Sequence, residues 1–108
     1  MAPEFTAQQI VTVFRSRLMP DADPQYVEHA EQMSDLVQTM PGYVDHKSFT
    51  ARDGERVTIV TFADRDSHEA WRLQADHVEA QRAGIATYYD TYSLQVATVD
   101  KVSRFVRR

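Results

Sequence analysis

The sequence contains no cysteine, and only three of its 108 residues are glycine. Without cysteine the chain forms no disulfide framework, no thiolate metal site and no cysteine nucleophile. The three glycines are isolated, so no glycine-rich loop is present to hold phosphate groups. No stretch approaches the roughly 18 apolar residues of a membrane span. The start of the chain lacks the basic and apolar segments of a signal peptide, and we expect a cytoplasmic protein.

Charge of one sign is also not in large excess. The chain has 12 basic and 16 acidic residues, and its formal net charge is −4. This mild acidity argues against a general nucleic-acid binder, which usually carries a basic excess. The length predicts a single domain spanning residues 1–108 with its core at about 9–99. Such a small two-layer core would gain stability from association with a partner.

Hydrophobic periodicity predicts six elements in the order strand, helix, strand, strand, helix, strand. Their expected ranges are 9–18, 23–39, 43–51, 56–63, 67–83 and 89–99, with a bend in the second helix near 75–76. Asp23 is a candidate cap for the first helix, and Asp66 with Glu69 forms a possible capping box for the second. Asp53-Gly54 predicts a tight hairpin, and Gly84 is expected to end the second helix.

This order predicts an α+β fold, the ferredoxin-like β-α-β-β-α-β arrangement, with an antiparallel four-stranded sheet and both helices on one face. The second face of the sheet carries too many apolar residues to be left in water. Packing of two such faces across a two-fold axis is the simplest solution, and we therefore expect a homodimer. Residues 100–108 are too apolar for a free tail, and docking on the partner subunit would cover them.

Two residues on the second predicted helix are the first candidates for a site. Trp71 is the only tryptophan, and it is interpreted as either a pocket wall or a core residue. His77 is the candidate catalytic residue, because an ordinary imidazole with a pKa of about 6.5 exchanges a proton near neutral pH. The alternative is a histidine that bonds a backbone carbonyl near the helix bend.

Aromatic and histidine residues elsewhere supply candidate substrate-binding groups. Tyr88 and Tyr92 are suited to hydrogen-bond a phenolic or quinone substrate, unless their hydroxyl groups simply lie at the protein surface. Phe14 is a candidate pocket wall. His46 is either a further substrate contact or a histidine on the sheet surface. We expect no metal site, because His68-Glu69 does not begin an H-E-x-x-H motif and no cluster of ligands at metal spacing occurs.

Several short motifs, in this order and spacing, resemble the antibiotic biosynthesis monooxygenase domain of the dimeric α+β barrel type. They are Met40-Pro41-Gly42-Tyr43, Asp53-Gly54, Glu69-Ala70-Trp71, Asp76-His77, and Gly84 followed by the tyrosine-rich start of the last strand. The resemblance covers residues from about 9 to 99. It implies a homodimer and a pocket in each subunit between the helices and the sheet.

The resemblance also implies a function. Family members include monooxygenases of aromatic polyketides that use no metal or flavin, and enzymes that degrade heme. The characteristic heme-ligating position falls on Gln81, and the asparagine that both groups use is missing, because this chain has none. From the family resemblance we nevertheless expect a cofactor-independent monooxygenase acting on a small aromatic or polyketide-like substrate. The alternatives are a non-catalytic small-molecule-binding or regulatory dimer and a heme-binding protein with a different iron ligand.

Overall fold

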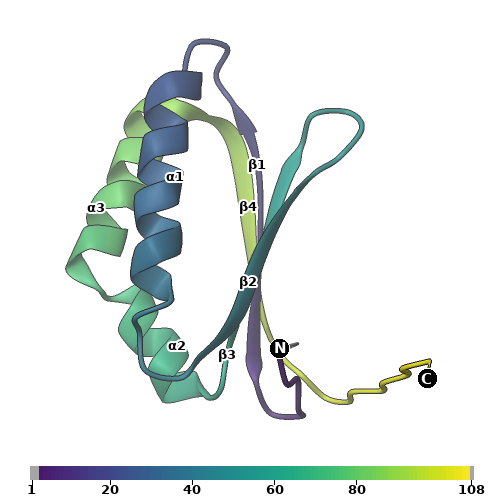
Figure 1. The fold of residues 1–108 in the computed structure, drawn as a ribbon. Helices are drawn as coiled ribbons and strands as arrows, with labels where there is room; N and C mark the ends of the chain where they lie inside the picture. The colour runs from purple at the N-terminus through teal and green to yellow at the C-terminus, as the bar shows by residue number, and fades with distance from the viewer. Residues whose placement is uncertain (1–2, 108) are drawn as a thin grey trace.

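A four-stranded sheet with all of its helices on one face makes up the fold (Figure 1). The computed structural model describes residues 3–107, except the side chain of Asp23, so the expected capping by Asp23 and the terminal Arg108 lie outside it. The elements are β1 (Ile10–Leu18), α1 (Asp23–Val37), β2 (Tyr43–Thr50), β3 (Arg56–Phe62), α2 (Arg65–Arg72), α3 (Ala75–Ala83), the π-helical turn η1 (Gly84–Tyr88) and β4 (Tyr89–Thr98).

The strand order is β2-β3-β1-β4, and each neighbouring pair is antiparallel. This confirms the expected ferredoxin-like α+β arrangement, with the second predicted helix divided into α2 and α3 near the predicted bend. The central strand β1 pairs with both β3 and β4. On each face of the sheet, a β1 side chain therefore lies between one side chain of β3 and one of β4.

The core fills the space between the sheet and the helices in two clusters. Ile10 and Phe62 face each other across β1 and β3 and are 2% and 1% exposed. One buried cluster joins Phe62 to a valine of α1 and the tryptophan of α2, and the other lies near the start of α1 and the end of α3. The first cluster consists of Val37, Phe62 and Trp71. The second consists of Ala22, Tyr26 and Tyr88.

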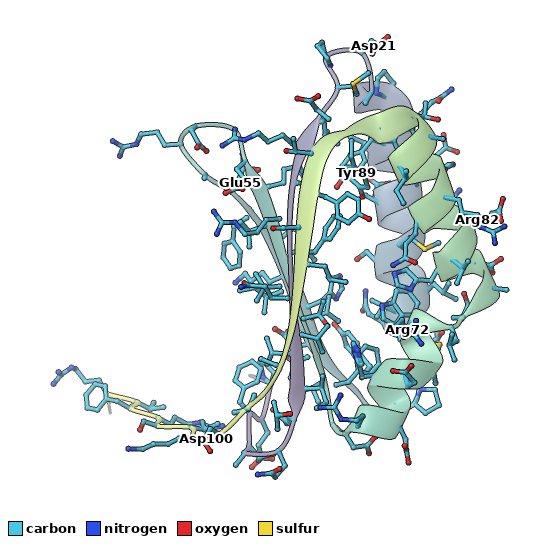
Figure 2. All side chains as sticks on the ribbon, turned by 180° about the vertical axis from the view of Figure 1, so that it is seen from behind. Asp21, Glu55, Arg72, Arg82, Tyr89 and Asp100 are labelled. Atoms are coloured by element: carbon cyan, nitrogen blue, oxygen red, sulfur yellow. The ribbon has the colours of Figure 1, made fainter. Side chains whose placement is uncertain are left out.

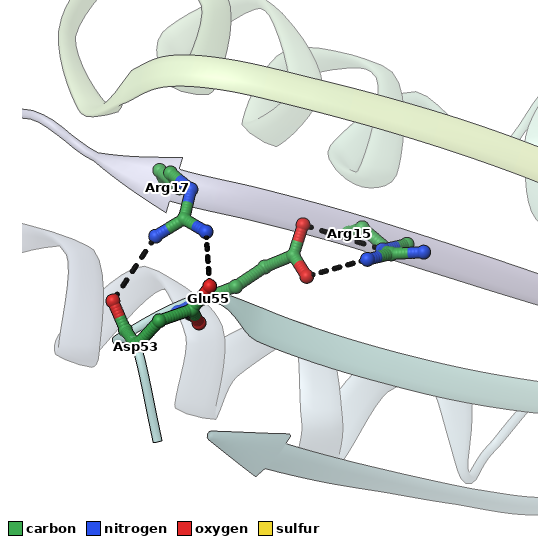
Figure 3. A network of polar contacts seen from close by, with 4 residues as sticks. All are labelled: Arg15, Arg17, Asp53 and Glu55. Carbon is green, nitrogen blue, oxygen red and sulfur yellow. Dashed lines mark hydrogen bonds and ion pairs between the residues drawn. The ribbon is translucent and has the colours of Figure 1, made fainter. Parts of the chain in front are cut away.

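The predicted hairpin between β2 and β3 is present and is tied to β1 by ion pairs. Gly54 has φ +93°, which the turn requires. The Nη2 of Arg15 lies 2.7 Å from a carboxylate oxygen of Glu55, and Arg17 makes the same contact with Asp53 (Figure 3). These bonds lower the pKa of both carboxyl groups. The two arginines thus hold the hairpin on the face of the sheet opposite the helices.

The predicted cap of the second helix was wrong by two residues. The expected cap of α2 was Asp66, but α2 begins at Arg65, and Asp64 accepts a hydrogen bond from the Ser67 N–H at 2.8 Å. Asp64 has the extended backbone of a cap residue, whereas Asp66 lies in the first helical turn. The backbone of α1 begins at Asp23, with Ala22 in the cap position.

α3 ends at Ala83, and Gly84 stands in its C-cap position as expected. Its φ of −59° is helical, and the chain continues through η1 before it enters β4. Glycine is nevertheless needed here, because a Cβ atom at this position would overlap the ring of Tyr89. The glycine therefore permits close packing of the Tyr89 ring rather than a left-handed turn.

The residues after β4 leave the body of the protein. Residues 100–107 have no regular structure and extend on the side of the sheet that faces away from the helices (Figures 1 and 2). Phe105 and Val106 are 76% and 72% exposed, although both are apolar. Within residues 3–107, no helix is long and apolar enough to cross a membrane.

We predict that Gly42→Ala destabilises the fold more than Gly54→Ala. Both glycines have positive φ, but a Cβ at Gly42 would also collide with the side chain of Ser67, whereas Gly54 has open space. The expected losses of unfolding free energy are about 2–4 kcal/mol for Gly42→Ala and about 1 kcal/mol for Gly54→Ala. Urea unfolding measures both values. Equal losses would show that the collision with Ser67 is relieved without cost.

Candidate functional site

Trp71 and His77 lie against each other where α2 passes into α3. Trp71 is 8% exposed and packs in the cluster with Val37 and Phe62. The rings of Trp71 and His77 are stacked, with centroids 4.0 Å apart and planes 14° apart. The side chain of Gln74 caps α3 by accepting a hydrogen bond from the His77 N–H at 2.9 Å. The break between the helices therefore fixes the position of the histidine.

A hydrogen bond also fixes the tautomer of His77. Its Nδ1 lies 3.0 Å from the carbonyl oxygen of Trp71, and a carbonyl only accepts, so Nδ1 carries the hydrogen. In the neutral ring this leaves the lone pair on Nε2. Burial lowers the pKa of His77, and the bond to Trp71 opposes this effect only in part. The imidazole is therefore neutral and oriented at pH 7, as a general base must be.

A second group of aromatic rings lies on the helix-facing side of β1 and β4. The ring of Phe14 is 5.4 Å from that of Tyr89 and 5.6 Å from that of Tyr92. Tyr89 points from the start of β4 into the space between the sheet and the helices (Figure 2). Burial raises its pKa, so its hydroxyl group stays protonated. Tyr92 is half-exposed, which leaves its ring free to contact a ligand.

Two hollows lie on the helix side of the sheet. One, of about 390 Å³, borders the aromatic group at the start of β4 and is lined by Ile85, Tyr89, Asp90, Thr91 and Tyr92. The other, of about 510 Å³, lies between α1 and α3. Its apolar side chains are Met33, Leu36, Ala80 and Ala83, and its polar ones are His29, Gln32, Asp76 and Glu79. Because Met33 and Leu36 also pack on the Trp71 cluster, this groove reaches the tryptophan end of the core.

The remaining two predicted site residues are bonded within the protein. Tyr88 is 4% exposed, and its hydroxyl group lies 2.8 Å from Nδ1 of His29. The ring nitrogens of His46 lie 2.7 Å from Ser34 Oγ and 2.6 Å from the Tyr43 hydroxyl oxygen. These bonds tie the edge strand β2 to α1. The structure thus forms two pairs of predicted site residues, Phe14 with Tyr92 and Trp71 with His77. The polar atoms of Tyr88 and His46 are hydrogen-bonded to other side chains of the protein.

Two further residues with buried polar atoms, His68 and Arg56, were not among the predicted site residues. His68 is 6% exposed, and its Nδ1 has no hydrogen-bond partner in the described part of the chain. Arg56 extends over the ring of Tyr26, 5.3 Å from its centroid. The strand pattern around Arg56 shows which face it occupies, but not what lies above that face. Residues 3–107 contain no group of three or more His, Cys, Asp or Glu side chains placed to hold a metal ion.

The sequence matches the model of the family described as "Antibiotic biosynthesis monooxygenase" over residues 9–83. The chain belongs to this family. The uncharacterized protein YqjZ of Bacillus subtilis (strain 168) is 30% identical over 93 residues, which are 86% of this chain and 82% of that protein. The family resemblance drawn from the short motifs is therefore confirmed.

Solved structures of other proteins share the fold of this chain. SnoaB, described as a cofactor-independent oxygenase from Streptomyces nogalater, has a TM-score of 0.74 and 19% identity, covering 89% of this chain and 97% of its own. Rv0793 from Mycobacterium tuberculosis has a TM-score of 0.77 and 16% identity, covering 88% of this chain and 99% of its own. At these identities the similarity concerns the fold.

We predict that acid weakens the fold through two histidines. Burial lowers the pKa of both His68 and His77 from 6.5, so below that pH the unfolded chain binds more protons than the folded one. The stabilisation is fully present above about pH 6.5 and is lost as the pH falls through the lowered values. Urea midpoints should decrease from pH 8 to pH 5.5. The double variant His68→Phe/His77→Phe should lose most of this slope, and an unchanged slope would contradict the assignment.

Proposed function

We propose that the protein is a cofactor-independent monooxygenase for a small aromatic or polyketide-like substrate. Membership of the family supports the class of reaction. The observation that carries the proposal for this chain is the neutral imidazole of His77, held by the ring and carbonyl group of Trp71. This arrangement supplies a base with a defined lone pair beside a large aromatic wall.

In the proposed reaction, His77 Nε2 accepts a proton from an acidic C–H or O–H group of the substrate. The resulting carbanion or phenolate reacts with O2 directly. For a methylene group between aromatic rings, the carbon gains one oxygen atom and loses two hydrogens, and these leave with the second oxygen as water. The substrate itself supplies all the electrons that reduce O2, so the reaction needs no further reductant.

The other predicted residues have separate roles in this proposal. Phe14 and Tyr92 form an aromatic surface for the substrate, and Trp71 is the wall beside the base. Tyr88 and His46 hold α1 in place through their bonds to His29 and Ser34. Tyr89, with its protonated hydroxyl group, is a further donor for an oxygen atom of the substrate.

We further propose that two copies associate through the face of the sheet opposite the helices. The register places Val13 beside Ile59 and Phe49 beside Val57 on this face, and Phe49 is 49% exposed. Residues 100–107 extend on the same side with Phe105 and Val106 uncovered. A second copy would bury both the apolar face and the extended tail.

We expect oxygen uptake when the purified, metal-free protein meets dihydroxynaphthalenes or anthrones, and a loss of about 10²–10⁴-fold in kcat for His77→Ala. The base must be neutral, so kcat/KM should hold at neutral pH and decrease as the pH falls below 6.5, through the lowered pKa of His77. An oxygen electrode across pH 5–8 measures both effects.

Arg82→Gln provides the matched control, because Arg82 lies on the same helix and is exposed. It should retain wild-type uptake. Uptake that His77→Ala leaves unchanged would remove this residue from the mechanism. Saturable ligand binding without oxygen uptake would favour a small-molecule-binding dimer instead.

The proposed dimer predicts a mass of about twice 12.4 kDa in sedimentation. Val13→Arg places a charge in the centre of the apolar face, and we expect it to give a monomer at micromolar concentration. Val27→Arg is the control, since Val27 is 49% exposed on the helix layer and its replacement should leave the mass unchanged. A wild-type monomer would contradict the proposed association.

A further inference from the structure

Arg56 is the first residue of β3, and its side chain is partly buried. Its Nε atom is buried and has no hydrogen-bond partner in the described part of the chain. The ion pairs found between residues 3 and 107 are made by other arginines. The neighbouring Glu55 faces the opposite side of the sheet, where it binds Arg15 (Figure 3).

The favourable contact found for the positive charge of Arg56 is with an aromatic ring. The guanidinium carbon lies 5.3 Å from the centroid of the Tyr26 ring, a favourable cation–π position. However, a partly buried arginine normally also forms hydrogen bonds to a carboxylate or another acceptor, because burial of an unpaired cation is costly. The buried Nε–H group of Arg56 can therefore donate a hydrogen bond to a ligand acceptor.

The side chains beside Arg56 carry hydroxyl groups and aromatic rings. In the register of the sheet, Ser16 lies opposite Arg56 on one side and opposite Tyr92 on the other. The three therefore form a row across β3, β1 and β4 on the helix-facing side, and Tyr92 also lines the hollow of about 390 Å³. Phe14 lies on the same face, with its ring 5.6 Å from that of Tyr92. A cation, hydroxyl groups and aromatic rings thus share one surface.

We propose that Arg56 binds the acidic oxygen of an aromatic ligand, either a carboxylate or an ionised phenol or enol. Its planar fork of N–H groups matches such an oxygen anion, while Phe14 and Tyr92 contact the rings. The proposal deepens the proposed function by naming the substrate class, and it rests on that function only for the reaction, not for the binding.

The test compares 2-naphthoate with 2-naphthamide, a neutral molecule of nearly the same shape, by calorimetry and by NMR of the ¹⁵N-labelled protein. We expect naphthoate to bind at least about tenfold more tightly and to shift the Arg56 Nε–H signal. Arg56→Gln should weaken naphthoate binding by about 10- to 100-fold and leave the amide almost unaffected. The exposed Arg52→Gln is the matched control and should bind naphthoate as the wild type does.

Three results would overturn the proposal: equal affinity for both compounds, undiminished naphthoate binding by Arg56→Gln, or no naphthoate binding at millimolar concentration. If Arg56→Gln does not fold, the test uses Arg56→Lys and the Nε–H signal of the wild type instead. The lysine keeps the positive charge but lacks the planar guanidinium group. Naphthoate binding is measured without turnover. A protein that binds naphthoate through Arg56 but consumes no oxygen would retain this site and lose the proposed oxygenase.

Discussion

The alternation of side chains along β1 is the constraint on which the rest of the structure depends. This strand pairs on both sides, so its even-numbered residues Phe14 and Ser16 align a row toward the helices. Its odd-numbered residues Val13 and Arg15 face the other way. A shift of one residue in register would exchange the two sets. The same strand therefore separates the candidate site from the surface proposed to bind a second copy.

The ion pairs at the hairpin fit this division. Arg15 and Arg17 form their bonds on the face away from the helices, and they hold the acidic hairpin residues there. Consequently neither Asp53 nor Glu55 is available to neutralise Arg56, although both are close to it in sequence. Within the described residues, the lack of an acceptor at Arg56 Nε follows from the strand alternation and not from a shortage of acidic residues.

Much of the fold could be predicted from the sequence, because periods of two and of three to four residues report directly on buried faces. The hairpin at Asp53-Gly54 was predicted for a local reason as well. The caps were less certain because Asp64 and Asp66 are both plausible acceptors, and only the backbone at Asp64 distinguishes them. The position of Gly84 at the end of α3 was predicted, but the reason for a glycine there, the ring of Tyr89, is a tertiary contact.

The candidate site was predictable in part for the same reason. Trp71 and His77 could be selected from the sequence because their residue types are rare in it and chemically suited to a site. Their stacking depends on the break between α2 and α3. Arg56 gave no signal, because an arginine at the start of a strand is ordinary until the absence of an acceptor around it is known.

The stack of Trp71 and His77 has one more consequence. Trp71 is the only indole in the chain, and its ring lies 4.0 Å from an imidazole that gains a proton in mildly acidic solution. A protonated imidazole in such contact quenches indole fluorescence by accepting an electron from the excited ring. The emission of the unmodified protein therefore reports the charge on His77, and the chain carries an internal optical indicator of the state of its candidate base.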